Sequence, residues 1–418
     1  SGTRGADGTQ AGSAAPPRPR RVVAYTGAGI STAAGVDDYA SGPRSRALQG
    51  CPKSLQDQSH HQSGAGGAAP KSPYLSQPTL CHRVLAACYH KGLLHGWLQQ
   101  NHDGLPQKAG FPQHALNEIH GSWYDPSNPV VPMSGELRKD LFEDFLRLKA
   151  EATVVLAFGT SLAGMNADSI CVETAQRQRA AWERDCESAT KSRDAEDTPV
   201  SPARSGLVIC SLQRTALDGH AALRIFAKLD RLAAAMVDEL DAKGSHEPPT
   251  MRDLVAASAP RTVKVEVPDI DPLTGNEVMV EVEQIVYPPR LQVEKGEGRE
   301  RGMASAQPEE DLFLVPYEAA TGRRIKEAAG SSEKGEPIEQ LTQLDLREGA
   351  TVKLVIGPHA GDDGEVVGKQ KEGHYRIRFR HALKPGAKLK APFERILGTW
   401  WVEAAVKGEV EVLPVVNV

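Results

Sequence analysis

Apolar and polar positions alternate between strand and helix patterns over the first part of the chain. Short apolar runs predict buried parallel strands in "RVVAYTGAGIS" (from residue 21), "ATVVLAFGTS" (152–161) and "GLVICSL" (206–212). The spacing of apolar side chains between and after these runs predicts helices at three places: Pro78 to about Lys91, around 166–184, and the end of 220–242. Strands that alternate with helices indicate an α/β fold with a Rossmann-like, mostly parallel sheet.

The pattern changes after about residue 245. Strict alternation on both sides of a Gly-Asn turn predicts a β-hairpin within 261–287. Residues 293–345 are rich in charge and predict no element, whereas 346–418 has an all-β pattern. A flexible tail rich in Gly, Ala and Pro precedes the first strand. We therefore expect four parts, namely the tail, an α/β domain, a hairpin and linker region, and a small β-barrel: 1–20, 21–243, 244–345 and 346–418.

The composition fits a soluble globular chain of roughly two or three domains. Hydrophobic residues make up 40% and charged residues 25% of the 418 positions, and the net charge of −5 excludes a general polyanion binder. No apolar run reaches the ~20 residues that a bilayer-spanning helix needs. The six cysteines contain no Cys-x-x-Cys pair and are scattered, which favours a reducing intracellular compartment, nuclear or cytoplasmic, with an organelle left open.

One turn carries candidate chemistry. The first strand feeds "TGAGISTAAGVDDY", a tight glycine turn that is expected to open a helix. Small residues allow backbone N–H groups to approach a pyrophosphate, and a helix N-terminus adds partial positive charge. By itself the Gly-Ala-Gly turn is at least as well explained by a purely structural turn.

Further blocks follow this turn in order: "SQPTLCHRVL", "KGLLHGWLQQNHDGLPQKAGFPQHALNEIHG", "FGTSL" and "VICSLQRTALDGHAALRIF". Together with the glycine turn they resemble the sirtuin family of NAD-dependent protein deacylases over roughly residues 20–242. The stretches "AGFPQHALNEIHG", "GELRKD" and "DGHAALRIF" look most like the nuclear, chromatin-associated branch. The resemblance implies a Rossmann-like NAD-binding domain over 21–243, NAD or ADP-ribose as the ligand, and an acyl-lysine protein as the substrate.

The resemblance also implies roles for particular residues. His120 would be the general base, because a neutral imidazole can take a proton from a ribose hydroxyl near working pH. Asn101 would act beside it, with Asp103 in the nicotinamide and ribose pocket. Gly27, Ala28 and Gly29 would hold the pyrophosphate. The remaining cofactor-binding residues implied by the motifs are Asp38, Tyr39, Gln100, Gly159, Thr160, Ser161, Ser211 and Leu212.

Structural alternatives stand beside two of these assignments. His120 can be an ordinary histidine at the end of an element. Asp103 can simply cap the turn at Gly104.

The chain departs from the family pattern in several places. Sirtuins carry two cysteine pairs that hold a structural zinc after the His-Gly motif, but here Ser122 to Ser134 contain no cysteine. No zinc or other metal ligand is therefore expected, and another element has to close that side of the cleft. The extra β region is the candidate for it. Ala40 also replaces an arginine that the family uses for productive NAD geometry.

Two further positions differ from the family. His102 replaces an apolar residue, which costs free energy if the ring is buried without a partner, and Ser211 replaces an asparagine on the adenosine side. These departures make efficient turnover doubtful. The alternative function is a catalytically impaired sirtuin-fold scaffold or structural subunit of a larger assembly.

The C-terminal segment "GATVKLVIGPHAGDDGEVVGK" resembles the KOW module, a small SH3-like barrel found in ribosomal and transcription proteins. In "HYRIRFR", apolar residues alternate with Arg376, Arg378 and Arg380, so one strand face is basic. Within 369–395 this face is expected to meet nucleic acid or an acidic protein surface, or to be merely a solvated barrel face. Trp400 and Trp401 are expected in the core or at an interface.

Overall fold

The computed structural model describes residues 20–36, 76–132, 135–191, 206–244, 248–259, 261–270, 277–286, 311–325, 341–370, 373–381 and 391–418. The N-terminal tail up to residue 19 lies outside these ranges, as do the predicted site residues Asp38 and Tyr39 and the substituted position Ala40. None of the helices in the described ranges combines the length and hydrophobicity needed to cross a membrane.

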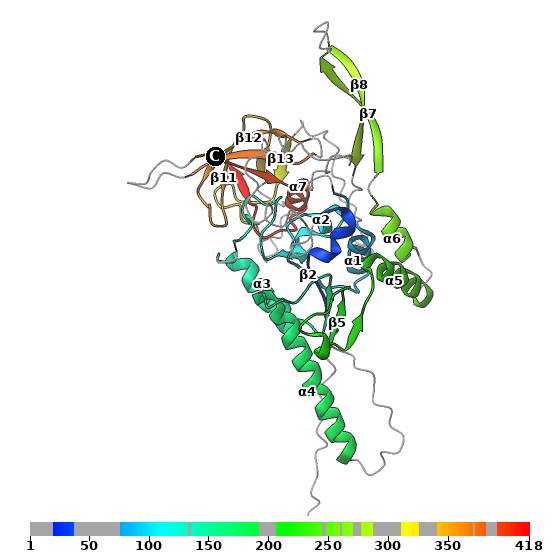
Figure 1. Cartoon of the computed structure of the whole chain (residues 1–418). Helices are drawn as coiled ribbons and strands as arrows, with labels where there is room; N and C mark the ends of the chain where they lie inside the picture. Colours follow the sequence, from blue (N-terminus) through cyan, green and yellow to red (C-terminus); the bar gives the residue numbers. More distant parts are fainter. Residues whose placement is uncertain are drawn as a thin grey trace, which may run out of the picture.

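A six-stranded parallel sheet forms the centre of the α/β domain (Figure 1). Its strand order is β3-β2-β1-β4-β5-β6, the order of the doubly wound dinucleotide-binding folds. The predicted apolar runs are confirmed as β1, β4 and β5, and the full set is β1 (Val22–Thr26), β2 (Gly96–Gln99), β3 (Leu116–Glu118), β4 (Val154–Phe158), β5 (Gly206–Cys210) and β6 (Leu223–Ile225). Because the chain leaves β1 and β4 in opposite directions along the sheet, their carboxyl ends define a crevice.

Helices cover both faces of this sheet (Figure 1). One face packs against α1 (Leu80–His90), α5 (Leu229–Lys243) and α6 (Met251–Ala257), and the other against α3 (Lys139–Glu151) and α4 (Ser169–Lys191). Strand residues alternate between the two cores: Ala24 joins the first, and Val23 and Tyr25 join the second. The α/β core thus includes α6 and extends past the boundary expected at residue 243.

The segment after β1 differs from the prediction. In place of an α-helix, the described part has two short 3-10 helices, η1 (Ala28–Ile30) and η2 (Thr32–Ala34). Gly35 then adopts a left-handed conformation with φ of 81°. The run "GISTAAG" is bounded by two glycines and contains the β-branched Ile30 and Thr32, which stabilise an α-helix less well than alanine does.

The β-rich part begins with the predicted hairpin, which is confirmed as antiparallel strands β7 (Arg261–Ile270) and β8 (Glu277–Val286), with the turn between them outside the described residues. A five-stranded antiparallel sheet follows: β11 (Thr351–Leu354), β12 (Asp363–Lys369), β13 (Tyr375–Arg380), β14 (Phe393–Leu397) and β15 (Val415–Asn417). A separate pair, β9 (Leu312–Val315) and β10 (Thr342–Asp345), contributes to the same hydrophobic core. This core therefore reaches back before the boundary expected at residue 346.

The all-β expectation for 346–418 is wrong at one element. Thr399–Val406 forms helix α7, whose residues Trp400, Trp401, Val402, Ala404 and Ala405 are buried. Glu403 and Val406 lie on its exposed face. A run of eight mostly apolar residues, "TWWVEAAV", is too short for periodicity alone to distinguish a helix from a buried strand. The two tryptophans are core residues, as expected.

Candidate functional site

A cavity of about 470 Å³ opens at the carboxyl ends of β1, β4 and β5. This is the sheet position at which open α/β folds bind ligands, and its size falls among ordinary ligand pockets. Nine of the predicted cofactor residues line it: Ala28, Gly29, Gln100, Asn101, Gly159, Thr160, Ser161, Ser211 and Leu212. Gly27 and Asp103 are not among the lining residues. Sequence reasoning missed the lining that precedes and begins α5, namely Ala227, Lys228, Leu229 and Asp230.

Two glycine turns pack directly against each other beneath the cavity. A Cβ on Gly29 would lie 2.8 Å from the Gly159 Cα, and a Cβ on Gly27 would lie 2.9 Å from the Thr160 Cβ. The Gly29 amide donates to the Gly159 carbonyl at 2.8 Å, and the Gly27 amide donates to the Phe158 carbonyl at 3.2 Å. These glycines therefore serve the packing of two loops, in addition to any role toward a phosphate.

A buried polar network joins the first glycine turn to the segment after β2. The Asn101 amide Nδ2 donates to the Gly27 carbonyl at 3.2 Å and to Ser31 Oγ at 3.0 Å. Ser31 Oγ donates in turn to Asp103 Oδ2 at 2.6 Å, and the Leu105 amide donates to Asp103 Oδ1 at 3.0 Å. Asp103 thus caps the turn at Gly104, as the structural alternative proposed, and its bond to Ser31 also fixes the glycine turn. Ser31 was missed, although it lies four residues after Gly27.

Gln100 connects the cavity wall to the sheet. Its Nε2 donates to the Tyr25 hydroxyl and, at 3.2 Å, to Thr160 Oγ1. The Tyr25 hydroxyl donates to Asp168 Oδ1 at 2.7 Å. Burial and the Asp168 carboxylate raise the pKa of Tyr25 well above its ordinary value, so the phenol stays protonated and keeps this donor. Tyr25 and Asp168 were not predicted, because 143 residues separate them in the chain.

His120 lies beside the cavity, at the end of β3, and does not line it. The backbone of Gln100, which is itself a lining residue, favours the protonated form of the His120 ring and so acts against the effect of burial on its pKa. Burial lowers the pKa of His120 to about 4, and the neighbouring His102 adds to the effect. The imidazole is therefore neutral at pH 7, as a base must be before it takes a proton.

His102 is buried, as its position predicted, but it has a partner. Its Nδ1 lies 2.8 Å from the Gly121 carbonyl, and the His102 carbonyl accepts from the Trp123 amide at 3.0 Å. Burial lowers the pKa of His102, so its neutral ring donates to that carbonyl. Because the ring has a hydrogen-bond partner, its burial does not carry the free-energy cost of an unpaired polar group. The same bond connects the segment after β2 to the turn that follows His120.

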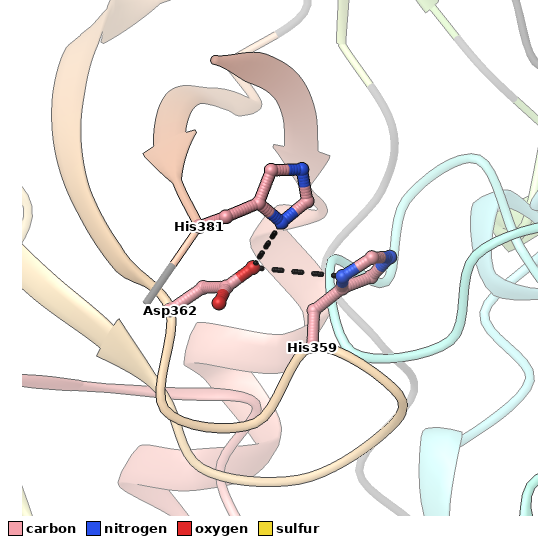
Figure 2. Close-up of side chains that lie close together, drawn as sticks. All are labelled: His359, Asp362 and His381. Atoms are coloured by element: carbon pink, nitrogen blue, oxygen red, sulfur yellow. Dashed lines mark hydrogen bonds and ion pairs between the residues drawn. The ribbon is translucent and has the colours of Figure 1, made fainter. Parts of the chain in front are cut away.

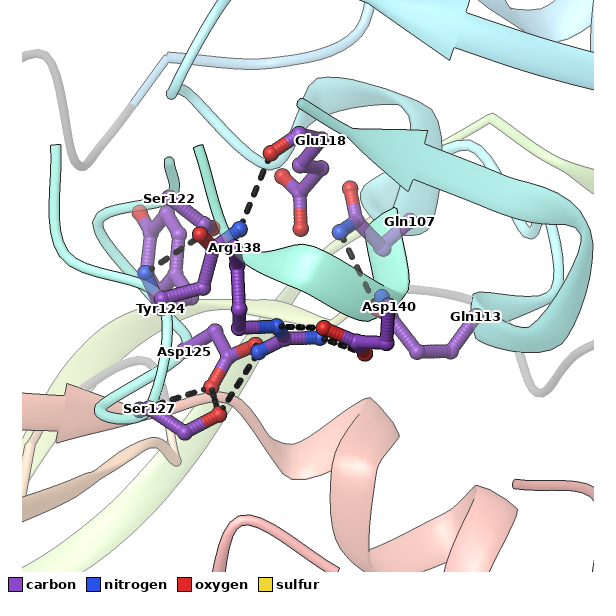
Figure 3. Close-up of polar contacts among 10 residues, drawn as sticks. Gln107, Gln113, Glu118, Ser122, Tyr124, Asp125, Ser127, Arg138 and Asp140 are labelled. Carbon is purple, nitrogen blue, oxygen red and sulfur yellow. Dashed lines mark hydrogen bonds and ion pairs between the residues drawn. The ribbon is translucent and has the colours of Figure 1, made fainter. Parts of the chain in front are cut away.

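The loop after His120 is held on one side by a polar cluster (Figure 3). Arg138 bridges the carboxylates of Asp125, at 3.1 Å, and Asp140, at 2.8 Å, and it also donates to Ser127 Oγ at 2.8 Å. Asn128 Nδ2 donates to the Glu118 carbonyl at 2.9 Å. These contacts tie the loop after His120 to the start of α3 and to the end of β3.

On its other side the same loop enters the core of the β-rich unit. Tyr124 is 1% exposed and belongs to that core, with ring contacts of 4.9 Å to His374 and 5.0 Å to Trp400. The Gly398 amide donates to the Tyr124 carbonyl at 2.9 Å. The β-rich unit therefore packs against the loop after His120.

The fold and the cavity define an α/β protein of the dinucleotide-binding type. No family model matches the chain. Its sequence is 28% identical over 248 residues to NAD-dependent protein deacetylase sirtuin-7 of Rattus norvegicus, covering 53% of this chain and 56% of that protein. It is 36% identical over 103 residues to the sirtuin-7 of Homo sapiens, covering 25% and 22%. The chain thus resembles the sirtuin family and spans about half the length of the longest-matching relatives.

Solved structures give a similar match. The structure described as "Sir2-p53 peptide-NAD+" covers 54% of this chain and 95% of its own, with 21% identity and a TM-score of 0.39. "Structure of Sir2Tm bound to a propionylated peptide" covers 53% and 93%, with 20% identity and a TM-score of 0.37.

Proposed function

We propose that this chain binds NAD or ADP-ribose in the 470 Å³ cavity and acts as an NAD-dependent protein-lysine deacylase. One observation carries the proposal: the motifs that resemble the sirtuins lie far apart in the sequence, yet nine of their residues line one cavity at the switch point of the sheet. The resemblance to proteins named NAD-dependent protein deacetylases supplies the ligand and the reaction class.

NAD bound in the cavity would supply a ribose whose bond to nicotinamide breaks as the acyl oxygen of a modified lysine attacks. His120, which is neutral at pH 7, would take a proton from a ribose hydroxyl. Gln100 lines the cavity, and its side chain is held in place because it is bonded to both Tyr25 and Thr160. Lys228 at the cavity edge adds positive charge for a pyrophosphate.

A second candidate is a nucleotide-binding scaffold with little turnover. Three observations favour it over a fast enzyme. The side chains of Asn101 and Asp103 already form hydrogen bonds within the protein, which leaves them fewer for a ligand. The backbone amides of Gly27 and Gly29 also donate within the protein. A base with a pKa of about 4 is also weak, since proton transfer is most efficient when the pKa lies near the working pH.

Calorimetry with NAD and ADP-ribose tests the binding step. Leu212 lines the cavity and is 66% exposed, so Leu212→Glu adds a negative charge to the cavity, which repels an anionic dinucleotide, without disturbing a core. Leu223→Glu is the matched control, because Leu223 is 52% exposed and lies outside the lining. We expect weaker binding in the first variant alone. No heat from the unaltered protein, or equal loss in both variants, refutes the proposed pocket.

Turnover is tested separately, by nicotinamide release with acyl-lysine peptides. If the chain is a deacylase, the unaltered protein releases nicotinamide. The His120→Asn variant then releases none, although it still binds the nucleotide. Binding without release in the unaltered protein selects the scaffold.

The basic strand of the β-rich unit offers weaker support for nucleic-acid binding. Arg380 lies opposite Asp363 on β12, and Arg378 lies between Glu365 on β12 and Glu394 on β14. Arg378 is paired with Glu394 at 2.8 Å. Carboxylates therefore offset much of the positive charge on this face, which favours an ion-paired barrel surface or a protein partner over a phosphate backbone. The test is retention of the protein on immobilised RNA. Retention of the unaltered protein that is lost in an Arg376/Arg378/Arg380→Ala variant would support nucleic-acid binding.

A further inference from the structure

Two histidines and an aspartate converge at one end of the β-rich unit (Figure 2). His359 and Asp362 lie in the turn between β11 and β12, and His381 directly follows β13. The Nδ1 atoms of both histidines face the same carboxylate oxygen, Asp362 Oδ2, at 3.5 Å from His359 and 3.0 Å from His381. One ligand atom from each residue lies within 4.8 Å of the other two.

These separations suit a small cation at the centre of the three atoms. Zinc binds histidine nitrogen and carboxylate oxygen at about 2.0–2.2 Å, so the ligand atoms of a tetrahedral site lie roughly 3.3 Å apart. The separations of 3.0 and 3.5 Å from Asp362 fall on either side of that value, and the two histidine ligand atoms lie within 4.8 Å of each other. An ion can therefore enter by replacing the protons between these atoms, with adjustments of side chains only.

The surroundings hold the three groups in place before any ion binds. The turn is fixed by hydrogen bonds from the Gly361 amide to the Leu354 carbonyl, at 2.7 Å, and from the Asp362 amide to the His359 carbonyl, at 3.0 Å. Asp362 is 6% exposed. The Phe393 ring packs on both imidazoles, 5.0 Å from His359 and 4.7 Å from His381. A preorganised set of this kind loses little entropy when it binds an ion.

We propose that His359, Asp362 and His381 bind one divalent transition-metal ion of the zinc class. A donor set of two imidazoles and one carboxylate, without thiolate, suits zinc and its neighbours rather than calcium or magnesium. Three protein ligands leave at least one coordination position for water or another ligand. None of the three residues lines the nucleotide cavity, so the site is separate from the proposed function. Spacing in the sequence did not predict it, because His381 comes from a different turn.

Cobalt substitution tests the site on the full chain. The protein is stripped with a chelator and titrated with Co²⁺ and then Zn²⁺, and the visible spectrum is recorded. We expect one equivalent of Co²⁺ with ligand-field bands and no sulfur-to-cobalt charge-transfer absorption, which separates this site from the six cysteines of the chain. Zn²⁺ then displaces the Co²⁺ and abolishes the bands.

Variants assign the ligands. His381→Gln and Asp362→Asn are each expected to weaken Zn²⁺ binding at least about tenfold, since even changes outside the ligand set cost that much. The control is His220→Gln, because His220 is an exposed histidine outside the cluster, and it should leave the affinity unchanged. Absence of the bands in the unaltered protein, a thiolate spectrum, or equal affinity in all variants overturns the proposal, and the first two results do not depend on whether a variant folds.

Discussion

Glu118 offers a test of the buried polar cluster behind His120. Its side chain is 2% exposed, and burial raises its pKa to about 8. Its Oε1 accepts a hydrogen bond from Gln99 Nε2 at 3.4 Å. Burial makes the neutral, protonated acid the favoured form of Glu118 at neutral pH. The perturbation is Glu118→Gln, which keeps the shape of the neutral acid and removes its titration.

The sign and size follow from linkage. The folded-state pKa lies above the unfolded value of 4.5, so the folded protein binds the extra proton and loses stability as pH rises from about 4.5 to about 8. Each unit of that shift corresponds to about 1.4 kcal/mol, so Glu118 removes roughly 3 to 5 kcal/mol of unfolding free energy across the window. The Gln variant lacks this loss. It should exceed the unaltered protein by a similar amount at pH 8 and lie within about 1 kcal/mol of it at pH 5.

Urea unfolding, followed by tryptophan fluorescence and circular dichroism at half-unit steps from pH 5 to pH 8, measures the difference. Glu136→Gln is the control, because Glu136 is an exposed glutamate of the same domain. Parallel pH profiles for the unaltered protein and Glu118→Gln would refute the assignment of a neutral, buried Glu118.

Three further predictions concern the loop after His120. Gly121→Ala should cost at least about 3 kcal/mol of stability in urea unfolding, because a Cβ there would lie 2.4 Å from the Pro129 carbonyl oxygen at a φ of +100°. Gly110→Ala, at a φ of +88° with open space around it, should cost only about 1 kcal/mol, and equal losses would contradict the steric argument. Tyr124→Ala should lower stability by about 3–5 kcal/mol and, by calorimetry, separate the melting of the two units; an unchanged single transition would show that Tyr124 does not couple them. Asp125→Asn should lower the free energy of unfolding by about 2–4 kcal/mol, since it leaves the Arg138 guanidinium with Asp140 as its carboxylate partner. A loss below about 1 kcal/mol would show that the Arg138–Asp125 pair is as weak as an exposed salt bridge.

The sequence alone predicted those elements whose pattern is local, that is, carried by neighbouring residues. The apolar runs predicted β1, β4 and β5, and the helical spacing predicted α1, because burial on one or both faces imposes a period on neighbouring residues. The strict alternation predicted the β7–β8 pairing for the same reason. The ordered motifs also located most of the cavity lining, since loops at the carboxyl ends of adjacent strands must meet.

Tertiary structure decided what depends on contacts between distant segments. Helix α7 escaped prediction because its eight residues are mostly apolar, and a short apolar run does not distinguish a strand from a helix until the buried and exposed faces are known. Asp103 and Ser31, Tyr25 and Asp168, and the residues around Tyr124 come together only when strands and loops far apart in the chain pack.

The same limit applies to the charges of the site. A pKa depends on burial and on neighbours across the fold, and no local pattern encodes either of them. The residue types at Glu118 and His120 were therefore plain from the sequence, but their protonation states at neutral pH followed only from the packed structure around them.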